Sequence, residues 1–230
     1  AVISWGMIAK NKWVKFVSVS WSNVKEELSE SFPIFLSTAA TSIYTACFVL
    51  ILGYFATPQE VGQYSAVDRI MRALCYMALI PVLQVFYPHI ASLAQQDKGL
   101  ALKRVGYLFG VVVACMVLIG CCMVFASPYA ITFLGDDYNH TDGLFAIMAA
   151  VPLFVGLGGV AGQLVLLAIG DSSYKNYFRN VYIVAGIVAI SSVLVLSYFY
   201  GMYGTAFALL LTEITVCVLM ISPVRKIYKS

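Results

Sequence analysis

Long stretches without a charged residue divide this chain into segments of membrane length. A helix rises 1.5 Å per residue, so roughly 20 apolar residues cross the hydrocarbon core of a bilayer. The uncharged stretches all reach that length, and they are residues 31–57, 73–96, 105–135, 143–170 and 180–212. This pattern predicts membrane-spanning helices. It also excludes a β-barrel, whose strands alternate in polarity over about 9–11 residues.

The last uncharged stretch is too long for one crossing, so we expect it to fold back on itself. Tyr198–Gly204 supplies glycines for a tight turn and tyrosines for a membrane interface. A hairpin there brings the predicted helices to six, at about 32–55, 63–93, 105–127, 143–169, 179–199 and 204–222. The expected fold class is therefore all-α integral membrane, a six-helix transmembrane bundle.

The predicted bundle fills residues 31–224 and is flanked by two short polar segments. Residues 1–30 are expected to hold the end of a truncated helix, or a short surface anchor, followed by a cytoplasmic connector. Within them, residues 12–21 mix tryptophan and phenylalanine with lysine, which suits either a helix lying on an anionic membrane surface or a connector with snorkelling lysines. Residues 225–230 form a basic cytoplasmic tail.

The positions of Lys and Arg predict the orientation in the membrane. All of them except Arg69 and Arg72 fall before the first helix, in the second-to-third and fourth-to-fifth connections, or in the tail. These alternate connections lie on one side of the membrane. Basic residues favour the cytoplasmic side, so both ends of the chain are expected to be cytoplasmic.

Composition excludes several classes of protein. The chain is 61% hydrophobic and 11% charged with a mean hydropathy of +0.89, whereas soluble domains have about 45–50% apolar and about 25% charged residues. A soluble enzyme and a disordered chain are therefore excluded. The formal net charge of +3 says little about nucleic acid, because a binder of that kind needs a clustered basic face, and nucleic acid is not an expected partner. Membrane lipids are expected partners.

Two arginines and an aspartate lie at the start of the second predicted helix. Arg69 and Arg72 are three residues apart and therefore share a face, and Asp68 is next to Arg69. If both arginines line a polar lumen, their guanidinium groups suit an anion such as phosphate. Alternatively, residues 73–93 alone span the bilayer and the arginines lie at its outer interface.

Two further polar residues interrupt apolar helices. Glu213 would carry a coupling proton or cation, pair with an arginine, or hydrogen-bond to neighbouring helices as packing. His89 follows Pro88, and with Pro81 this proline would kink the second helix, either as part of a transporter gate or merely to shape packing.

No cofactor or metal site is expected. His140 lies in an outer loop with Asp136, Asp137 and Asp142, a spacing that is common in solvated loops. The six cysteines all fall within apolar stretches, where they act as small hydrophobic residues. A membrane enzyme would need catalytic side chains in sizeable outer loops, and the outer loops here are short, so the chain is not expected to be an enzyme.

Several segments carry a family resemblance, and their order along the chain adds to it. They are Glu27–Ser37, Phe48–Phe55, Glu60–Ile70 (EVGQYSAVDRI), Val85–His89 (VFYPH) and Tyr203–Ala208 (YGTAFA) with Glu213. Together they resemble O-antigen (Wzx-type) polysaccharide flippases of the multidrug, oligosaccharidyl-lipid and polysaccharide exporter superfamily. The likeness extends from Lys25 to about Ser222.

The resemblance implies a function. Members of this family have about twelve helices in two six-helix bundles and flip undecaprenyl-diphosphate-linked oligosaccharide across the bacterial inner membrane by alternating access. The chain would be the C-terminal half, and its missing N-terminal half would be a partner. Arg69 and Arg72 would grip the diphosphate, while Glu213, with Asp68 and His89 as other polar lumen residues, would couple transport to a proton or sodium gradient.

Two other interpretations stay open. A multidrug or cation antiporter of the same superfamily would favour a cavity dominated by acids, and the only acids within predicted spans are Asp68 and Glu213. The chain would otherwise be an inactive structural half of a transporter.

Overall fold

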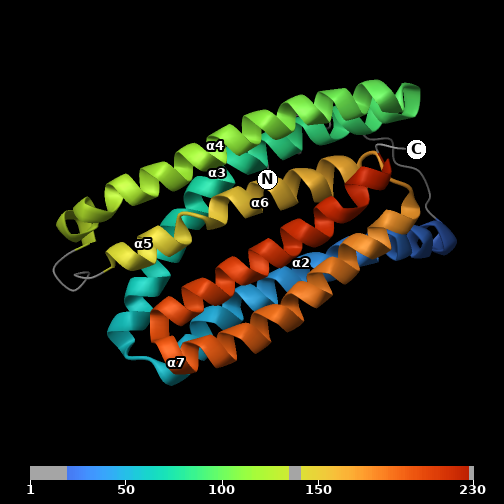
Figure 1. Cartoon of the computed structure of the whole chain (residues 1–230). Coiled ribbons are helices and arrows are strands. Elements are labelled where there is room, and N and C mark those ends of the chain that lie inside the picture. Colours follow the sequence, from blue (N-terminus) through green and yellow to red (C-terminus); the bar gives the residue numbers. More distant parts are fainter. Residues whose placement is uncertain (1–19, 135–140, 228–230) are drawn as a thin grey trace, which may run out of the picture.

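A computed structural model of the chain describes residues 20–134 and 141–227, and all the regular elements in these ranges are helices (Figure 1). In chain order they are α2 (Trp21–Phe55), α3 (Pro58–Gln96), α4 (Lys98–Leu134), α5 (Asp142–Met148), α6 (Val151–Gly159), the π-helix η2 (Val160–Leu167) and α7 (Ser172–Ile227). The predictions for the extreme N-terminal helix end, the 12–19 surface segment, the acidic loop at 135–140 and the last three residues lie outside the described residues.

The predicted hairpin is confirmed within α7. Gly201 has φ 54° and ψ −132°, a conformation that only glycine adopts readily, and the chain reverses there (Figure 1). The hydroxyl groups of Ser197 and Thr205 lie 2.7 Å apart and hydrogen-bond across the turn. Five helical segments of the described chain are long and apolar enough to cross a membrane, and α7 provides two crossings, which gives the six predicted helices.

Several helix boundaries differ from the prediction. Helix α2 begins at Trp21, within the segment predicted as a connector, because Ser20 caps it by accepting a hydrogen bond from the Ser22 amide. Helix α3 begins at Pro58, where Thr57 and Glu60 form a capping box. The helices continue past the apolar windows that defined the prediction because capped polar turns extend them. Helix α7 also continues into the predicted tail, as far as Ile227.

The membrane span predicted over 143–169 is confirmed at Asp142–Leu167, but it is not one regular α-helix. It is divided into α5, α6 and η2, with a turn at Ala149–Ala150. Pro152 follows that turn and has no amide proton to give to the preceding helix. In η2 the hydrogen bonds skip one residue more than in an α-helix, as in the bond from the Ala168 amide to the Gln163 carbonyl (3.2 Å).

The glycine-rich segment at 156–162 packs closely against neighbouring helices. A methyl group added at Gly156 would lie 2.6 Å from the Met116 side chain on α4, and one at Gly162 would lie 2.8 Å from the Phe178 ring on α7. α2 packs mainly on α7, and α3 mainly on α4. Because these glycines have no side chain, α6 and η2 can pack closely against α4 and α7.

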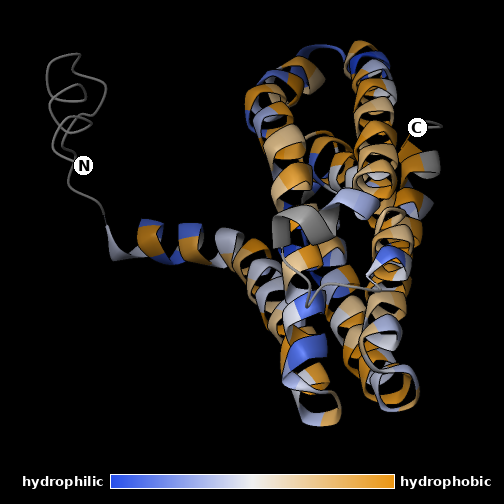
Figure 2. Cartoon of the chain, turned by 90° about the vertical axis from the view of Figure 1, so that its left-hand side faces the viewer, coloured by the Kyte–Doolittle hydropathy of each residue, from blue (hydrophilic) through white to orange (hydrophobic). Residues whose placement is uncertain are grey.

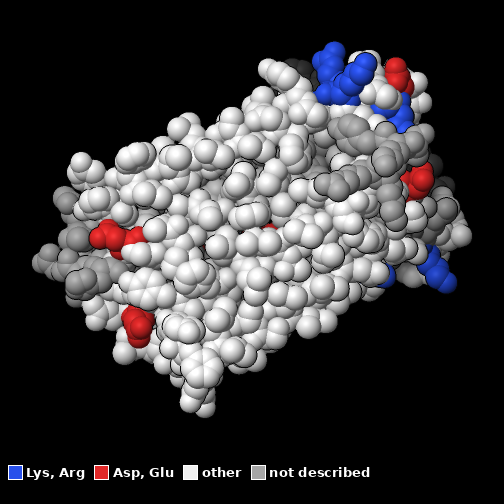
Figure 3. All heavy atoms as spheres, in the orientation of Figure 1, with Lys and Arg blue, Asp and Glu red and all other residues white. Residues whose placement is uncertain are grey.

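The outer surface of the bundle is apolar along its length (Figure 2). On α4, for example, Tyr107, Leu118 and Phe125 are 64–77% exposed. The first part of α2 projects away from the other helices and carries polar residues (Figure 2). On the face seen in Figure 3, the described Lys and Arg side chains gather at one end, whereas acidic side chains lie at both ends. An apolar band between polar ends is the surface of a membrane protein.

Candidate functional site

An ion pair lies on the inner side of α3. The Nε of Arg72 donates to both carboxylate oxygens of Asp68, one turn earlier, at 2.9 and 3.0 Å. The two side chains are only 19% and 12% exposed. A guanidinium has five N–H donors, and these bonds use the one on Nε, so the terminal amino groups of Arg72 keep donors for a ligand.

Arg72 reaches a depth at which a charge needs a polar environment. It is the fifteenth residue of the 39-residue α3, which places it about 21 Å along a helix of about 58 Å. In a bilayer centred on this helix, with a hydrocarbon core of about 30 Å, that position lies inside the core. This geometry favours the predicted lumen position for Arg72 over the outer interface.

A small cavity of about 160 Å³ is lined by both Arg72 and Glu213 of α7, and we call it the charged cavity. Glu213 is 8% exposed and close enough to Arg72 and Asp68 to interact electrostatically with both. The remaining polar lining comes from tyrosines, a threonine and a glutamine, namely Tyr44, Tyr76, Tyr182, Thr41 and Gln163. The cavity therefore places one cation and one carboxylate in a polar environment between α3 and α7.

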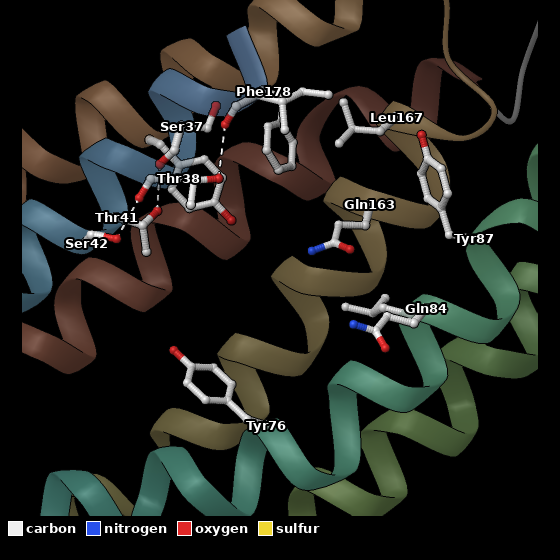
Figure 4. A pocket seen from close by; sticks show the side chains of 13 residues that line it. Ser37, Thr38, Thr41, Ser42, Tyr76, Gln84, Tyr87, Gln163, Leu167 and Phe178 are labelled. Atoms are coloured by element: carbon white, nitrogen blue, oxygen red, sulfur yellow. Dashed lines mark hydrogen bonds between the residues drawn. The ribbon is translucent and has the colours of Figure 1, made fainter. Parts of the chain in front are cut away.

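A larger pocket of about 680 Å³ adjoins the charged cavity, and we call it the amide pocket (Figure 4). Both are lined by Thr41, Tyr76, Leu83, Gln163 and Tyr182, so they are neighbours. The part that belongs to the amide pocket alone includes Gln84 from α3. Helices α2, α3 and α7 and the π-helix η2 all contribute to its walls.

The hydroxyl groups along α2 line one wall of the amide pocket. Thr41 donates to the Ser37 carbonyl at 2.9 Å, and Ser42 donates to the Thr38 carbonyl at 3.0 Å (Figure 4). Ser37 and Thr38 bond in the same way to carbonyl groups four residues earlier. The hydroxyl protons are thus used within the helix, and the oxygens keep lone pairs that accept hydrogen bonds.

The structure separates the residues predicted for the site. Arg72 and Glu213 meet in the charged cavity, and Asp68 lies behind Arg72. Arg69 and His89 are exposed and line neither the charged cavity nor the amide pocket. The two arginines were expected to share a face because they are three apart, but Arg72 turns inward to Asp68, its partner at the four-residue spacing.

The described ranges contain no group of three or more His, Cys, Asp or Glu that would hold a metal ion. His140 and its neighbours Asp136 and Asp137 lie outside those ranges.

The amide pocket is the part of the site that sequence reasoning missed. Gln163 is the only Asn, Gln or charged residue within the 143–170 stretch, which is a recognisable signal of a functional position in a membrane helix. The hydroxyl stripe of Ser37, Thr38, Thr41 and Ser42 also has helical spacing. Neither feature stands out by charge, which is why the prediction concentrated on Arg, Asp and Glu.

Comparison with known proteins finds matches to polysaccharide biosynthesis proteins and to proteins named as O-antigen transporters. Residues 1–94 match the family of polysaccharide biosynthesis proteins. The chain is 30% identical over 230 residues to an Escherichia coli K12 protein named "Putative O-antigen transporter", and 27% identical over 225 residues to a Shigella dysenteriae protein of the same name. No solved structure matches the chain.

Each of these two alignments covers 97% of this chain but only 53% and 55% of the relatives, so the chain spans about half of their length. The relatives are transporters rather than enzymes, in agreement with the prediction from the short loops. The resemblance inferred from the sequence is thereby confirmed: the chain is similar to polysaccharide biosynthesis proteins and to proteins named as O-antigen transporters.

Proposed function

We propose that this chain is the C-terminal half of a transporter that moves undecaprenyl-diphosphate-linked oligosaccharide across the bacterial inner membrane by alternating access. The observation that carries the proposal is the position of Arg72, a guanidinium at membrane depth facing a polar cavity between α3 and α7. Arginine forks fit phosphate oxygens, and a low dielectric strengthens the contact. The names of the relatives support polysaccharide transport in general.

In this proposal the diphosphate is held by the terminal amino groups of Arg72. Asp68 accepts hydrogen bonds from the Nε of Arg72 and so holds the guanidinium in place. The terminal amino groups of Arg72 are therefore oriented before the ligand arrives. Arg69, which is exposed, takes no part in this contact within the described half.

Glu213 is the proposed coupling residue. It shares the charged cavity with Arg72, so the presence of an anion near Arg72 changes the electrostatic cost of a charge on Glu213. A proton or sodium ion bound at Glu213 would then be linked to the binding of the diphosphate, and linkage of this kind is reciprocal.

The charges support a proposed orientation, and the aligned length of the relatives supports a proposed partner. The described basic residues Lys98, Lys103, Arg104, Lys175 and Arg179 lie near the connection from α3 to α4 and the start of α7, which we propose to be cytoplasmic. The N-terminal bundle of the same transporter would cover the open side of the site.

The test is complementation of a flippase-deficient bacterium by the full-length transporter. We expect surface polysaccharide to be restored by the unchanged protein and by a Lys103→Ala control, and to be lost with Arg72→Ala. Normal surface polysaccharide with Arg72→Ala, at equal protein level in the membrane, would contradict the proposed role of Arg72.

A cation antiporter of the same superfamily is the second candidate. The specific observation in its favour is that Asp68 already neutralises Arg72 and that Glu213 adds a further carboxylate. Efflux of cationic dyes by the full-length protein, lost in Glu213→Gln and accompanied by no rescue of surface polysaccharide, would favour this alternative.

A further inference from the structure

The amide pocket differs from the charged cavity in its chemistry. Its lining, drawn entirely from described residues, contains no charged side chain, and it combines hydroxyl groups, two side-chain amides and aromatic rings. Its volume of about 680 Å³ lies within the range of about 300–1,000 Å³ typical of small-molecule sites. It is therefore large enough for a ligand, and it has no counter-charge to offer one.

The two amides are directed into the pocket without a protein partner. Figure 4 shows the amide groups of Gln84 and Gln163 in the space between α3 and η2, with Tyr76 on the same side of α3. Among the described residues, neither amide has a hydrogen bond to another side chain or to the backbone. Each amide supplies two donors and an acceptor, which match the hydroxyl and acetamido groups of sugars.

The π-helix explains how Gln163 comes to face the pocket. It is the only polar residue of η2, and its neighbours Ala161, Gly162 and Leu164 are buried. The wider turn of a π-helix changes the direction of a side chain relative to a regular helix, and such turns occur frequently at functional sites. Gly162 allows this turn to pack against the Phe178 ring, which also lines the pocket.

From this arrangement we propose that the amide pocket binds the sugar portion of the lipid-linked substrate and selects uncharged sugars. Gln84 and Gln163 hydrogen-bond to hydroxyl or acetamido groups, the α2 hydroxyl oxygens accept from sugar hydroxyls, and Tyr76 offers a ring for the apolar face of a sugar. A uronic acid would gain no cation from this lining, which contains no charged side chain. The inference rests on the proposed function, because the shared lining residues place this pocket, and thus the sugar, next to the charged cavity and the diphosphate.

The test is a binding measurement on the full-length transporter in lipid nanodiscs with three probes. They are undecaprenyl diphosphate alone, undecaprenyl diphosphate carrying a neutral oligosaccharide of hexose and N-acetylhexosamine, and the same lipid with one hexose replaced by a uronic acid. Binding of the bare lipid reports on the proposed diphosphate site, and the difference between the two oligosaccharide probes reports on the amide pocket.

We expect the neutral probe to bind at least tenfold more tightly than the other two. In the double variant Gln84→Leu/Gln163→Leu that advantage disappears, while the affinity for the bare lipid is unchanged. Gln96→Leu, an exposed glutamine at the end of α3 and outside the pocket, is the matched control and keeps the wild-type affinities. The unfolding temperature of each variant checks that it is folded.

Two results would overturn the inference: equal affinity for the neutral and acidic probes, or a tenfold advantage of the neutral probe that survives in the double variant. Failure of the bare lipid to bind, with the neutral probe still preferred over the acidic one, would instead contradict the diphosphate site and leave the amide pocket supported.

Discussion

The charged cavity and the amide pocket are adjacent but hold a ligand by different physical means. The charged cavity contains a compensated set of charges, in which Asp68 binds Arg72 and Glu213 lies nearby. The amide pocket has no charge in its lining and offers hydrogen bonds and aromatic surface. A lipid-linked glycan has the same division between an anionic diphosphate and a polar sugar, so the two regions are expected to respond to different mutations.

The largest effect is expected for Arg72→Ala. This change leaves the Asp68 carboxylate without its cation, which we expect to lower the free energy of unfolding by about 2 kcal/mol, less than for a fully buried pair, because the side chains are 19% and 12% exposed. Transport should be lost as well. Urea or thermal unfolding in detergent and the complementation assay measure the two effects.

A second variant separates stability from binding. Asp68→Ala/Arg72→Ala removes both charges, so the unfolding temperature should recover while transport stays absent. Recovery of transport in the double variant would show that Arg72 serves only to pair with Asp68, and the distinction between the two regions would be broken.

Glu213→Gln is expected to have the next largest effect. The substitution preserves the shape of the side chain and removes its charge, so that transport in proteoliposomes should lose its dependence on the ion gradient and slow by about tenfold. Binding of the neutral glycan probe should change little. Full gradient dependence in Glu213→Gln would assign coupling to another residue.

Gly162→Ala should weaken the amide pocket selectively. Its new methyl group would lie 2.8 Å from the Phe178 ring and 3.2 Å from the Met220 sulfur, which costs about 1 kcal/mol and moves the ring. We expect the preference for the neutral glycan to fall by a few fold and the affinity for bare undecaprenyl diphosphate to persist. Gly186→Ala is the matched control, because nothing lies within 4 Å of the added atom. Equal losses in the two variants would contradict a specific role for η2 packing.

The smallest effect is expected for Arg69→Ala. This arginine is exposed and outside both regions, so the free energy of unfolding should change by less than about 0.5 kcal/mol. The affinity for undecaprenyl diphosphate should change by less than twofold. A loss as large as that of Arg72→Ala would restore the predicted two-arginine site.

Much of the fold follows from local sequence patterns. Uncharged stretches and the glycines at Tyr198–Gly204 predict the six crossings, because hydrocarbon forces the backbone to satisfy its own hydrogen bonds. The close contacts at Gly156 and Gly162 follow from their small size. Helix ends were less accurate, since caps such as Ser20 and Thr57 extend helices beyond the apolar windows.

The site was predicted less completely, for two physical reasons. The pairing of Asp68 with Arg72 follows the four-residue spacing along a helix, whereas the prediction rests on the three-residue spacing of the two arginines. The direction of Gln163 depends on the π-helical turn, and the sequence carries no periodic signal of that turn.

The most direct test of the central claim is a titration of the full-length transporter, in nanodiscs, with undecaprenyl diphosphate that carries no sugar. We predict that Arg72→Gln weakens binding at least tenfold and that Arg69→Gln leaves it within twofold of the unchanged protein. Unchanged affinity in a folded Arg72→Gln protein would contradict the assignment of Arg72 as the residue that binds the diphosphate.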